Sequence, residues 1–283
     1  MPGSKRILVT GATGTVGREL TAQLIAAGSS VRALARDPDA VRLPTGAEAV
    51  RGDLGDPASL VGPLEGVDAA FLLWPYTSEK AAQETAPAVV TTIASSVERI
   101  VYLSADAARA DPGSFWARVE QLVERAGVAR TVLRPTGFAK NTLVWAPQIR
   151  AGDVVRWPYG AATRSLIDER DVAAVAVRAL TEAGHDGASY TLTGPERLTQ
   201  VQQVEAIGEA LGRPLRWEEA TPDDVRPLVV EALGDAAFAD HALRAWARFV
   251  DEPELVTQTV QDLTGSPAHT LRAWAERHVA DFR

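Results

Sequence analysis

The chain has 283 residues, of which 46% are hydrophobic and 23% charged, so it is long enough to bury a substantial core. Its formal net charge of −8 disfavours nucleic acid as a partner, because affinity for phosphates comes mainly from Lys and Arg. Cysteine is absent, which excludes disulfides, thiol nucleophiles and thiolate-bound metals. No apolar run approaches about 20 residues, and no long apolar leader precedes the first strand-like run, so we expect a cytoplasmic protein that does not cross a membrane.

Short apolar runs alternate with helical patterns in the first half of the chain. Residues 7–9 predict the first strand, and the amphipathic pattern that follows predicts a helix that stops at Gly28. Further strands are predicted at residues 30–35, 47–51, 69–74, 99–104 and 128–134, with helices at residues 79–97 and 115–125. Strands that alternate with helices indicate an α/β fold with a doubly wound parallel sheet.

The alternation weakens in the second half. Short extended segments are expected at residues 153–156, 165–167, 189–193 and 214–217, helices at residues 171–180 and 199–212, and a mostly helical remainder from residue 222. Thr199 and Gln202 have the spacing of a capping box. We therefore expect a sheet domain over residues 1–156, to which residues 165–194 return, and a smaller, mostly helical lobe over residues 157–283.

Three glycines separate the first strand from the first helix. Gly11 permits a sharp turn out of the strand, Gly14 leaves room for a pyrophosphate beside the backbone, and Gly17 lets the helix pack closely on the sheet. The helix N-terminus then offers N–H groups and a partial positive charge to the phosphates. This strand, turn and helix predict a dinucleotide site, in preference to a glycine-rich turn without a ligand.

Several segments together resemble the NmrA-like group of atypical short-chain dehydrogenases. The resemblance rests on GATGTVG at residues 11–17, ALARDP at 33–38, RGDL at 51–54, VEQLVERAGVARTVLRP at 119–135, YTLTGPERLT at 190–199 and LTGSPAHTLRAWAERHVADF at 263–282. It implies a Rossmann domain that binds NAD(P), a C-terminal substrate lobe, and reductases that act on quinones, azo dyes or phenolic carbonyls. It also implies members that bind the nucleotide without redox chemistry.

The cofactor is expected at the glycine turn and at the carboxyl ends of the strands. Arg36 ends the second strand, where an acidic residue would select NAD, so NADP(H) is favoured, and NAD(H) remains possible through Asp37. Asp53 and Leu54 resemble the adenine-contacting pair of similar proteins. The expected cofactor-binding residues are Thr10, Gly11, Thr13, Gly14, Thr15, Val16, Gly17, Arg36, Asp53, Leu54, Leu73, Trp74, Ser104 and Pro135.

The proton-transfer residues of the wider superfamily are missing from their usual helix. Dehydrogenases of that superfamily carry Tyr-x-x-x-Lys on the helix after the fifth strand, whereas residues 115–125 contain neither residue. Tyr76 and Lys80 have this spacing but follow the fourth strand, which favours a chance match. Ser104 lacks a histidine partner in sequence range, which disfavours a hydrolase triad. Tyr76, Lys80 and Ser104 are therefore candidate catalytic residues, and none is certain.

The helix at residues 115–125 differs from its relatives in a second way. Trp116 and Glu120 stand where similar proteins often have His and Glu, and an indole cannot carry protons at neutral pH. Glu120 and Glu124 share a face of the helix and are interpreted as solvated charges. None of the histidines has metal-ligand spacing, so no metal site is predicted.

Aromatic residues follow several of the predicted strands. The expected substrate-binding residues are Trp74, Tyr76, Trp116, Phe138, Trp145 and Trp157. Core packing is the alternative for any one of them, because tryptophan is usually largely buried. Together they predict an aromatic pocket that binds a small planar ligand by stacking and apolar burial.

These observations favour an NAD(P)H-dependent oxidoreductase that acts on a quinone or another planar aromatic carbonyl. Analogy extends this to a tailoring step in aromatic polyketide biosynthesis, including an oxygenation in which the reduced aromatic reacts with O₂. The alternatives are a non-catalytic NAD(P)-sensing regulator that binds a protein partner, and an interaction protein with a vestigial site. The sequence leaves the substrate, the direction of the reaction and the oligomeric state open.

Overall fold

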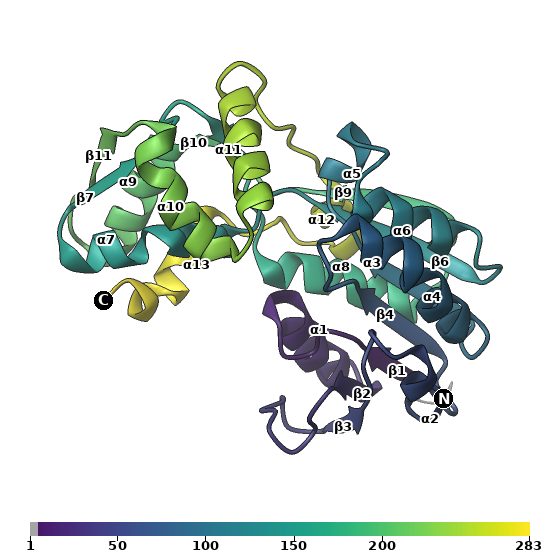
Figure 1. Cartoon of the computed structure of the whole chain (residues 1–283). Coiled ribbons are helices and arrows are strands. Elements are labelled where there is room, and N and C mark those ends of the chain that lie inside the picture. Colours follow the sequence, from purple (N-terminus) through teal and green to yellow (C-terminus); the bar gives the residue numbers. More distant parts are fainter. Residues whose placement is uncertain (1–4) are drawn as a thin grey trace. The chain divides into compact units, whose positions relative to one another are not determined.

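The computed structural model describes residues 5–283 and divides them into two compact units (Figure 1). Unit 1 is built from three segments of the chain. The first ends at Pro135, the second is Glu169–Leu192 and the third is Thr259–Ser266. Unit 2 contains Thr136–Asp168, Thr193–Gln258 and Pro267–Arg283. The chain therefore leaves the sheet domain at residue 135, earlier than the expected boundary at residue 156, and it returns twice.

Unit 1 is built on a seven-stranded sheet in which every pairing is parallel. The strand order is β3-β2-β1-β4-β5-β6-β9. The strands are β1 Arg6–Val9, β2 Ser30–Ala35, β3 Ala47–Arg51, β4 Ala69–Leu73, β5 Arg99–Leu103, β6 Ala129–Pro135 and β9 Ala188–Leu192. The order reverses between β1 and β4, which confirms the predicted doubly wound Rossmann fold. In such sheets, a ligand is expected at the carboxyl ends of the strands beside this reversal.

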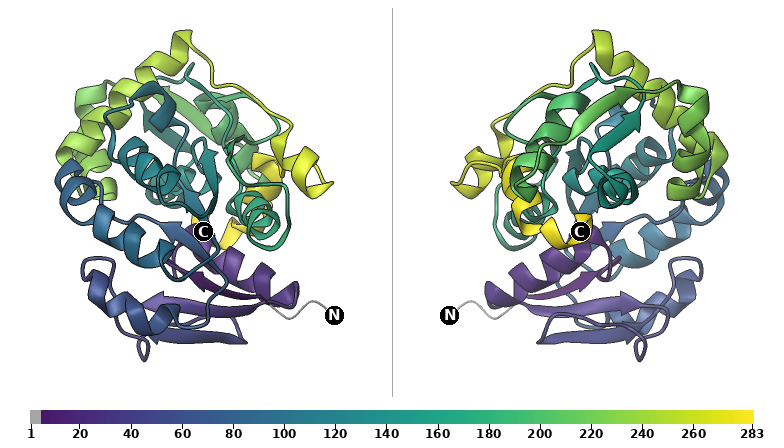
Figure 2. Two further views of the ribbon diagram at one scale, coloured as in Figure 1. Left: turned by 90° about the vertical axis from the view of Figure 1, so that its right-hand side faces the viewer. Right: turned by 90° about the vertical axis from the view of Figure 1, so that its left-hand side faces the viewer.

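Helices cover both faces of this sheet. Its helical elements are α1 Thr15–Ala26, η1 Pro57–Leu60, α2 Val61–Leu64, α3 Glu79–Glu84, α4 Ala86–Ala94, α5 Ala107–Ala110, α6 Phe115–Glu124, α8 Glu169–Thr181 and α12 Thr259–Thr264. Helix α8 packs against α1 and α12, and α6 packs against α3 and α4. Figure 2 shows the purple α1 beside the N-terminal strands from two sides. On the α4 and α6 side, Leu8, Leu72 and Tyr102 of the strands share a core with Val89 and Val119 of the helices.

The helix predicted over residues 79–97 is split into α3 and α4. Ser78 caps α3 by accepting a hydrogen bond from the Ala81 N–H, and α3 ends at Glu84. Pro87 lies in the first turn of α4, where its missing N–H leaves no hydrogen bond unmade. The continuous apolar periodicity of this segment concealed the break.

Unit 2 is mostly helical, with two short sheets. Strands β7 Val154–Trp157 and β11 Arg216–Glu219 are parallel, and β8 Thr163–Arg164 and β10 Leu198–Thr199 are antiparallel. The helical elements are η2 Ala139–Trp145, α7 Ala146–Ala151, α9 Gln200–Leu211, α10 Pro222–Leu233, α11 Ala236–Asp251, α13 Leu271–Arg277 and η3 Val279–Phe282. The predicted capping box of Thr199 and Gln202 opens α9. Trp145 and Ile149 pack with Trp157 in the core of unit 2, which is why residues 136–156 belong to this unit.

Across residues 5–283, every helix is too short or too polar to cross a membrane.

Candidate functional site

The glycine turn between β1 and α1 is shaped by close backbone contacts. Gly11 has φ of +65°, a left-handed conformation that favours glycine, and its carbonyl accepts a hydrogen bond from the Gly14 N–H at 2.9 Å. A Cβ on Gly17 would lie 2.1 Å from that same carbonyl oxygen, so only glycine fits there. A Cβ on Gly14 would have one near neighbour, the Gly11 oxygen at 3.2 Å. Gly14 is therefore free of the packing constraint that fixes Gly17.

The N-terminus of α1 is open to an anionic ligand. Gly14 occupies the N-cap, so no side chain caps the first N–H groups, and the first turn contains no acidic residue. Thr13 and Gly14 are exposed, whereas Val16 is buried and contributes to the core. The turn thus has the free donors that a pyrophosphate requires.

Thr10 holds two strands together at the point where the strand order reverses. Its hydroxyl accepts a hydrogen bond from the Leu73 N–H at 2.7 Å and lies 3.2 Å from the Leu73 carbonyl. The residue is fully buried. Although Thr10 was expected to bind the cofactor, its side chain has a structural role. Leu73 is half-buried beside the glycine turn, where a Cβ on Gly11 would lie 3.2 Å from its Cδ1 atom.

Arg36 presents an uncommitted positive charge after β2. In the part of the chain that the structure describes, its guanidinium makes no side-chain hydrogen bond or ion pair, and the residue is exposed. The neighbouring Asp37 pairs with Arg51 at 3.5 Å, and Arg51 also donates to the Arg36 carbonyl at 2.8 Å. Because Asp37 already has a cation, this edge offers a free guanidinium rather than a free carboxylate.

Tyr76 lies beside Asp53. Its hydroxyl donates to Asp53 Oδ1 at 3.2 Å, and the same oxygen accepts from the Gly55 N–H at 2.8 Å. Burial first and the Asp53 carboxylate second raise the pKa of Tyr76, while the charge of Arg36 opposes this rise. Tyr76 therefore belongs with Asp53 and Arg36, at the end of the sheet expected to hold the adenosine.

Lys80 has a partner of its own. It lies 3.9 Å from Glu84 on α3, with 80% of its side chain exposed. Tyr76 and Lys80 therefore make separate contacts in the structure, and their Tyr-x-x-x-Lys spacing does not form a hydrogen-bonded pair. This finding agrees with the interpretation of the spacing as a chance match.

A buried polar network lies where β5 and β6 end. Ser104, the residue directly after β5, donates its hydroxyl hydrogen to Glu120 Oε1. Arg134 binds both oxygens of the same carboxylate, with Nε at 3.0 Å from Oε1 and Nη2 at 2.5 Å from Oε2. The exposed fraction of the side chain is 6% for Glu120 and 21% for Arg134. The Glu120 carboxylate first of all, by its hydrogen bond, raises the pKa of Arg134.

The expectation that Glu120 is a solvated charge was wrong. Glu120 is buried and fully engaged, whereas Glu124 is exposed. One signal in the sequence pointed to this arrangement. Glu120 lies between Val119 and Val123 on the buried side of α6, and Arg134 lies between the buried Leu133 and Pro135 of β6. A charged residue in each of these places requires a partner.

The aromatic residues expected to bind substrate fall into both units. In unit 1, Trp74 is buried and packs edge-on against Tyr76 with 5.0 Å between ring centroids. Trp116 is half-buried, with its ring 4.1 Å from that of Phe115. Trp74 keeps an indole N–H that is buried without a hydrogen-bond partner.

Trp145 and Trp157 occupy the core of unit 2. They are 3% and 1% exposed, with ring centroids 6.5 Å apart. Because unit 2 covers them completely, we reassign both from substrate binding to packing. Phe138 is half-buried in unit 2 and forms a β-bridge with Ile167. Pro135 is buried at the end of β6, where its carbonyl accepts from the Asp106 N–H at 2.9 Å.

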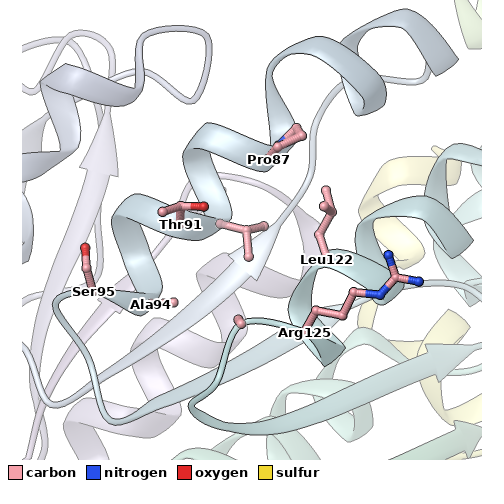
Figure 3. A pocket seen from close by; sticks show the side chains of 8 residues that line it. Pro87, Thr91, Ala94, Ser95, Leu122 and Arg125 are labelled. Atoms are coloured by element: carbon pink, nitrogen blue, oxygen red, sulfur yellow. The ribbon is translucent and has the colours of Figure 1, made fainter.

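A shallow groove of about 440 Å³ lies on a different part of unit 1 (Figure 3). Its lining residues are Pro87, Val90, Thr91, Ala94, Ser95, Leu122, Arg125 and Ala126. They come from α4 and from the end of α6, and Ser95 and Ala126 precede strands β5 and β6. The groove is therefore placed toward the amino ends of these strands, away from the predicted ligand edge, and it is not a candidate for the reaction site.

Titratable residues do not gather into a metal centre among residues 5–283, where no group of three or more His, Asp or Glu side chains converges. His185 contacts the Tyr190 hydroxyl at 2.9 Å, and His278 contacts Asp281 at 2.8 Å.

Comparisons with known proteins agree with this geometry. The model of the NmrA-like family matches residues 3–252. A (4-alkanoyl-5-oxo-2,5-dihydrofuran-3-yl)methyl phosphate reductase of Streptomyces griseus is 42% identical over 282 residues, covering 98% of this chain and 99% of the relative. An NAD(P)H azoreductase of Xenophilus azovorans is 33% identical over 286 residues, with 98% and 99% covered.

Among solved structures, the NADPH-dependent quinone oxidoreductase of Escherichia coli in complex with NADPH has a TM-score of 0.80 with this chain. The two are 24% identical, and the alignment covers 97% of this chain and 99% of the other. This likeness shows a shared fold.

Proposed function

Because this chain belongs to the NmrA-like family, we propose that it is an NADP(H)-dependent reductase of planar, conjugated carbonyl compounds such as quinones. One observation carries the proposal. The edge of the sheet combines a dinucleotide turn with a buried network of Ser104, Glu120 and Arg134 in place of the Tyr and Lys of related dehydrogenases. The site can thus bind a hydride donor, but it holds no acid ready to protonate an alkoxide.

The residues of unit 1 fit NADP(H). The uncapped N-terminus of α1 would hold the pyrophosphate, and the exposed Gly14 leaves space for its approach. The free guanidinium of Arg36 would pair with the phosphate on the adenosine ribose. Asp53 keeps its second carboxylate oxygen, Oδ2, available for an adenine amino group. When bound, NADPH supplies the hydride.

The chemistry of Ser104 and Glu120 supports a particular class of acceptor. Reduction of a simple ketone leaves an alkoxide, which needs a proton from a positioned acid. Ser104 gives its hydrogen to Glu120, and Glu120 is neutralised by Arg134, so neither is an acid. Reduction of a quinone leaves a phenolate-like anion whose conjugate acid has a pKa of about 10, as for tyrosine, and water can protonate it. Binding and orientation would then supply most of the catalysis.

The relatives support the same class of acceptor. The name of the Streptomyces protein describes a ring C=C bond in its substrate, and one carbon of this bond carries both the ring carbonyl and the alkanoyl group. Hydride addition to such a bond leaves a negative charge that is delocalised over two carbonyl groups. The azoreductase likewise takes its name from a conjugated acceptor. An alkanoyl dihydrofuranone phosphate is therefore our second candidate substrate, favoured by the 42% identity.

The test is a loss of NADPH absorbance with a panel of acceptors. We expect turnover with 1,4-naphthoquinone, an azo dye or an alkanoyl dihydrofuranone phosphate, and none without an acceptor. Gly14→Val is the matched negative control, because its side chain would fill the place of the pyrophosphate. Oxygen consumption recorded in the same assay tests the oxygenation hypothesis.

Two outcomes would contradict the proposal. NADPH binding without turnover of any acceptor would favour a nucleotide-sensing regulator that binds a protein partner. Absence of NADPH binding in calorimetry would contradict the cofactor assignment itself and favour an interaction protein with a vestigial site.

A further inference from the structure

The hydroxyl of Ser104 has a fixed polarity. Arg134 binds both oxygens of Glu120, and a guanidinium in a protein is always charged, so Glu120 is a carboxylate that can only accept hydrogen bonds. The hydrogen shared by Ser104 and Glu120 therefore comes from Ser104. A serine hydroxyl has a single hydrogen, so Ser104 has none left to donate.

The hydroxyl oxygen of Ser104 can still accept hydrogen bonds. A hydroxyl oxygen has two lone pairs. The Tyr102 hydroxyl, two residues earlier on the same face of β5, is buried and interacts with Ser104, but it makes no hydrogen bond of normal geometry within residues 5–283. Even a contact with Tyr102 would occupy one of the two lone pairs and leave the other open.

Ser104 also stands at the edge where a ligand is expected. It follows β5 directly, and its N–H donates to the Leu133 carbonyl of β6 at 2.8 Å. The register that pairs Leu73 with Leu103 places Ser104 level with Trp74 of the neighbouring strand. These positions are the carboxyl ends of β4, β5 and β6, beside the reversal in strand order.

We propose that Glu120 and Arg134 are positioning residues that lock Ser104 as a hydrogen-bond acceptor, so that this point of the site selects a ligand N–H or O–H group. The inference rests on the proposed nucleotide site. Two ligand groups have this chemistry: the carboxamide N–H of nicotinamide and a hydroxyl of the substrate. In either case, a ligand oxygen without a hydrogen at that position would be repelled by the Ser104 lone pairs and by the nearby negative charge of Glu120.

The cofactor arm of the test replaces the donor with an acceptor. Nicotinic acid adenine dinucleotide phosphate carries a carboxylate where NADP⁺ carries a carboxamide. By calorimetry, we expect the wild-type protein to bind NADP⁺ about tenfold or more tightly than this analogue, as for a hydrogen bond that involves a charged group. The substrate arm compares 6-hydroxy- with 6-methoxy-1,4-naphthoquinone on the NADP⁺ complex, where we expect a preference of about two- to tenfold for the hydroxyl.

The variant that opens the lock is Glu120→Leu with Arg134→Met. Replacing a buried ion pair with apolar side chains of similar volume is often neutral for stability, and it frees the Ser104 hydrogen. Whichever preference the wild type shows should fall to within about threefold, because a free hydroxyl can donate as well as accept. Ser104→Ala should also lose the preference, and Ser104→Thr should keep it.

The control is Glu79→Leu with Arg118→Met. These residues form an exposed pair at 3.8 Å between α3 and α6, so the variant removes the same two charges without touching Ser104. It should keep the wild-type preference. Circular dichroism on each variant establishes that it is folded.

The outcomes show which ligand group binds Ser104, the nicotinamide carboxamide or a substrate hydroxyl, or they overturn the proposal. Loss of the cofactor preference in the unlocked variant assigns the nicotinamide carboxamide to Ser104, and loss of the quinone preference assigns the substrate hydroxyl. A wild type that distinguishes neither pair of ligands, or an unlocked variant that keeps the preference, would overturn the lock. Because these measurements record binding, the lock can stand without turnover, whereas absence of NADP⁺ binding would contradict both the lock and the proposed cofactor.

Discussion

We propose that Arg36 is the residue that selects NADP(H) over NAD(H). Its guanidinium is free, while Asp37, the competing acidic residue, pairs with Arg51. We expect Arg36→Ala to weaken NADPH binding by about 10- to 100-fold, which corresponds to the loss of roughly 1.5–3 kcal/mol of charge-assisted hydrogen bonding. NADH binding should hardly change, because NADH lacks that phosphate.

Calorimetric titration with both cofactors checks this prediction. Arg125→Ala is the control, since it removes an equal charge from the end of α6 beside the groove in Figure 3. Equal weakening of NADPH and NADH would remove Arg36 from the phosphate site, and tighter binding of NADH by the wild type would transfer the selection to Asp37.

Arg134 supports the fold as well as the site. Removing one partner of a buried ion pair leaves an uncompensated charge, which typically costs about 3–5 kcal/mol. We therefore expect Arg134→Met to lower the free energy of unfolding by about 3 kcal/mol or more, because Glu120 is 5% exposed. Arg118→Met, which breaks the exposed pair with Glu79, should cost about 0–1 kcal/mol.

Urea denaturation of the two variants measures the difference. If Arg118→Met were as destabilising as Arg134→Met, the buried ion pair would contribute no more to the free energy of unfolding than the exposed pair. The sequence places a charged residue in each of two apolar surroundings, but it does not reveal that they pair, because Glu120 and Arg134 lie on different elements and only the packing of α6 on β5 and β6 brings them together.

At the scale of elements, the glycine turn was predictable because its chemistry is local. An apolar run, three glycines and an amphipathic helix form one continuous segment, in which Gly11 adopts a left-handed conformation and Gly17 leaves room for the Gly11 carbonyl. The break between α3 and α4 was not predicted, because one apolar stripe runs through both helices. The boundary at residue 135 was missed because the assignment of residues 136–156 depends on packing in the core of unit 2.

The same turn gives a prediction that separates binding from folding. Gly14→Val should keep the fold and lose NADPH binding, because its Cβ has only one near neighbour, at 3.2 Å. Gly17→Ala should destabilise the protein itself, because its Cβ would lie 2.1 Å from the Gly11 carbonyl oxygen. Gly62→Ala is the control, since no atom lies within 4 Å of its added Cβ.

Thermal unfolding and NADPH titration distinguish these variants. A Gly14→Val protein that binds NADPH like the wild type would contradict the proposal that the turn binds the pyrophosphate. A Gly17→Ala protein as stable as the wild type would show that the turn can relax in a way the structure does not indicate.

At the scale of the whole molecule, each of the two units is built from segments that are far apart in the sequence. The last segment supplies α12 to unit 1 and α13 with η3 to unit 2. Val260 is 3% exposed, and Trp274 and Phe282 are fully buried. A chain that ends at residue 258 should therefore lose stability in both units.

Calorimetric thermal unfolding of the truncated chain tests this expectation, with removal of the exposed Arg283 alone as the control. We expect the truncated chain to unfold at a much lower temperature or to lose a cooperative transition, because five buried apolar side chains disappear with their helices. An unchanged transition would mean that residues 259–283 are dispensable for the fold.

For the reaction as a whole, we propose that the site transfers hydride to acceptors whose product anion needs no enzymatic acid. Burial and neighbouring carboxylates raise the pKa of Tyr76 and of Tyr102, so both phenols stay protonated at neutral pH. The raised pKa of Tyr76 favours the folded protein below its ordinary value of 10.0, and this contribution is lost only as the pH rises through the folded value. Neither tyrosine titrates in the neutral range.

The most direct test is the pH profile of kcat/KM for NADPH oxidation, measured with 1,4-naphthoquinone and with cyclohexanone. We predict a flat profile between about pH 6 and 8 for the quinone, since none of the residues assigned to the site is a histidine. The ketone should react at least about 100-fold more slowly, because positioned acids usually contribute that much or more. Comparable rates for the two acceptors, or a steep limb near neutrality, would contradict the account and reveal a proton donor that it does not contain.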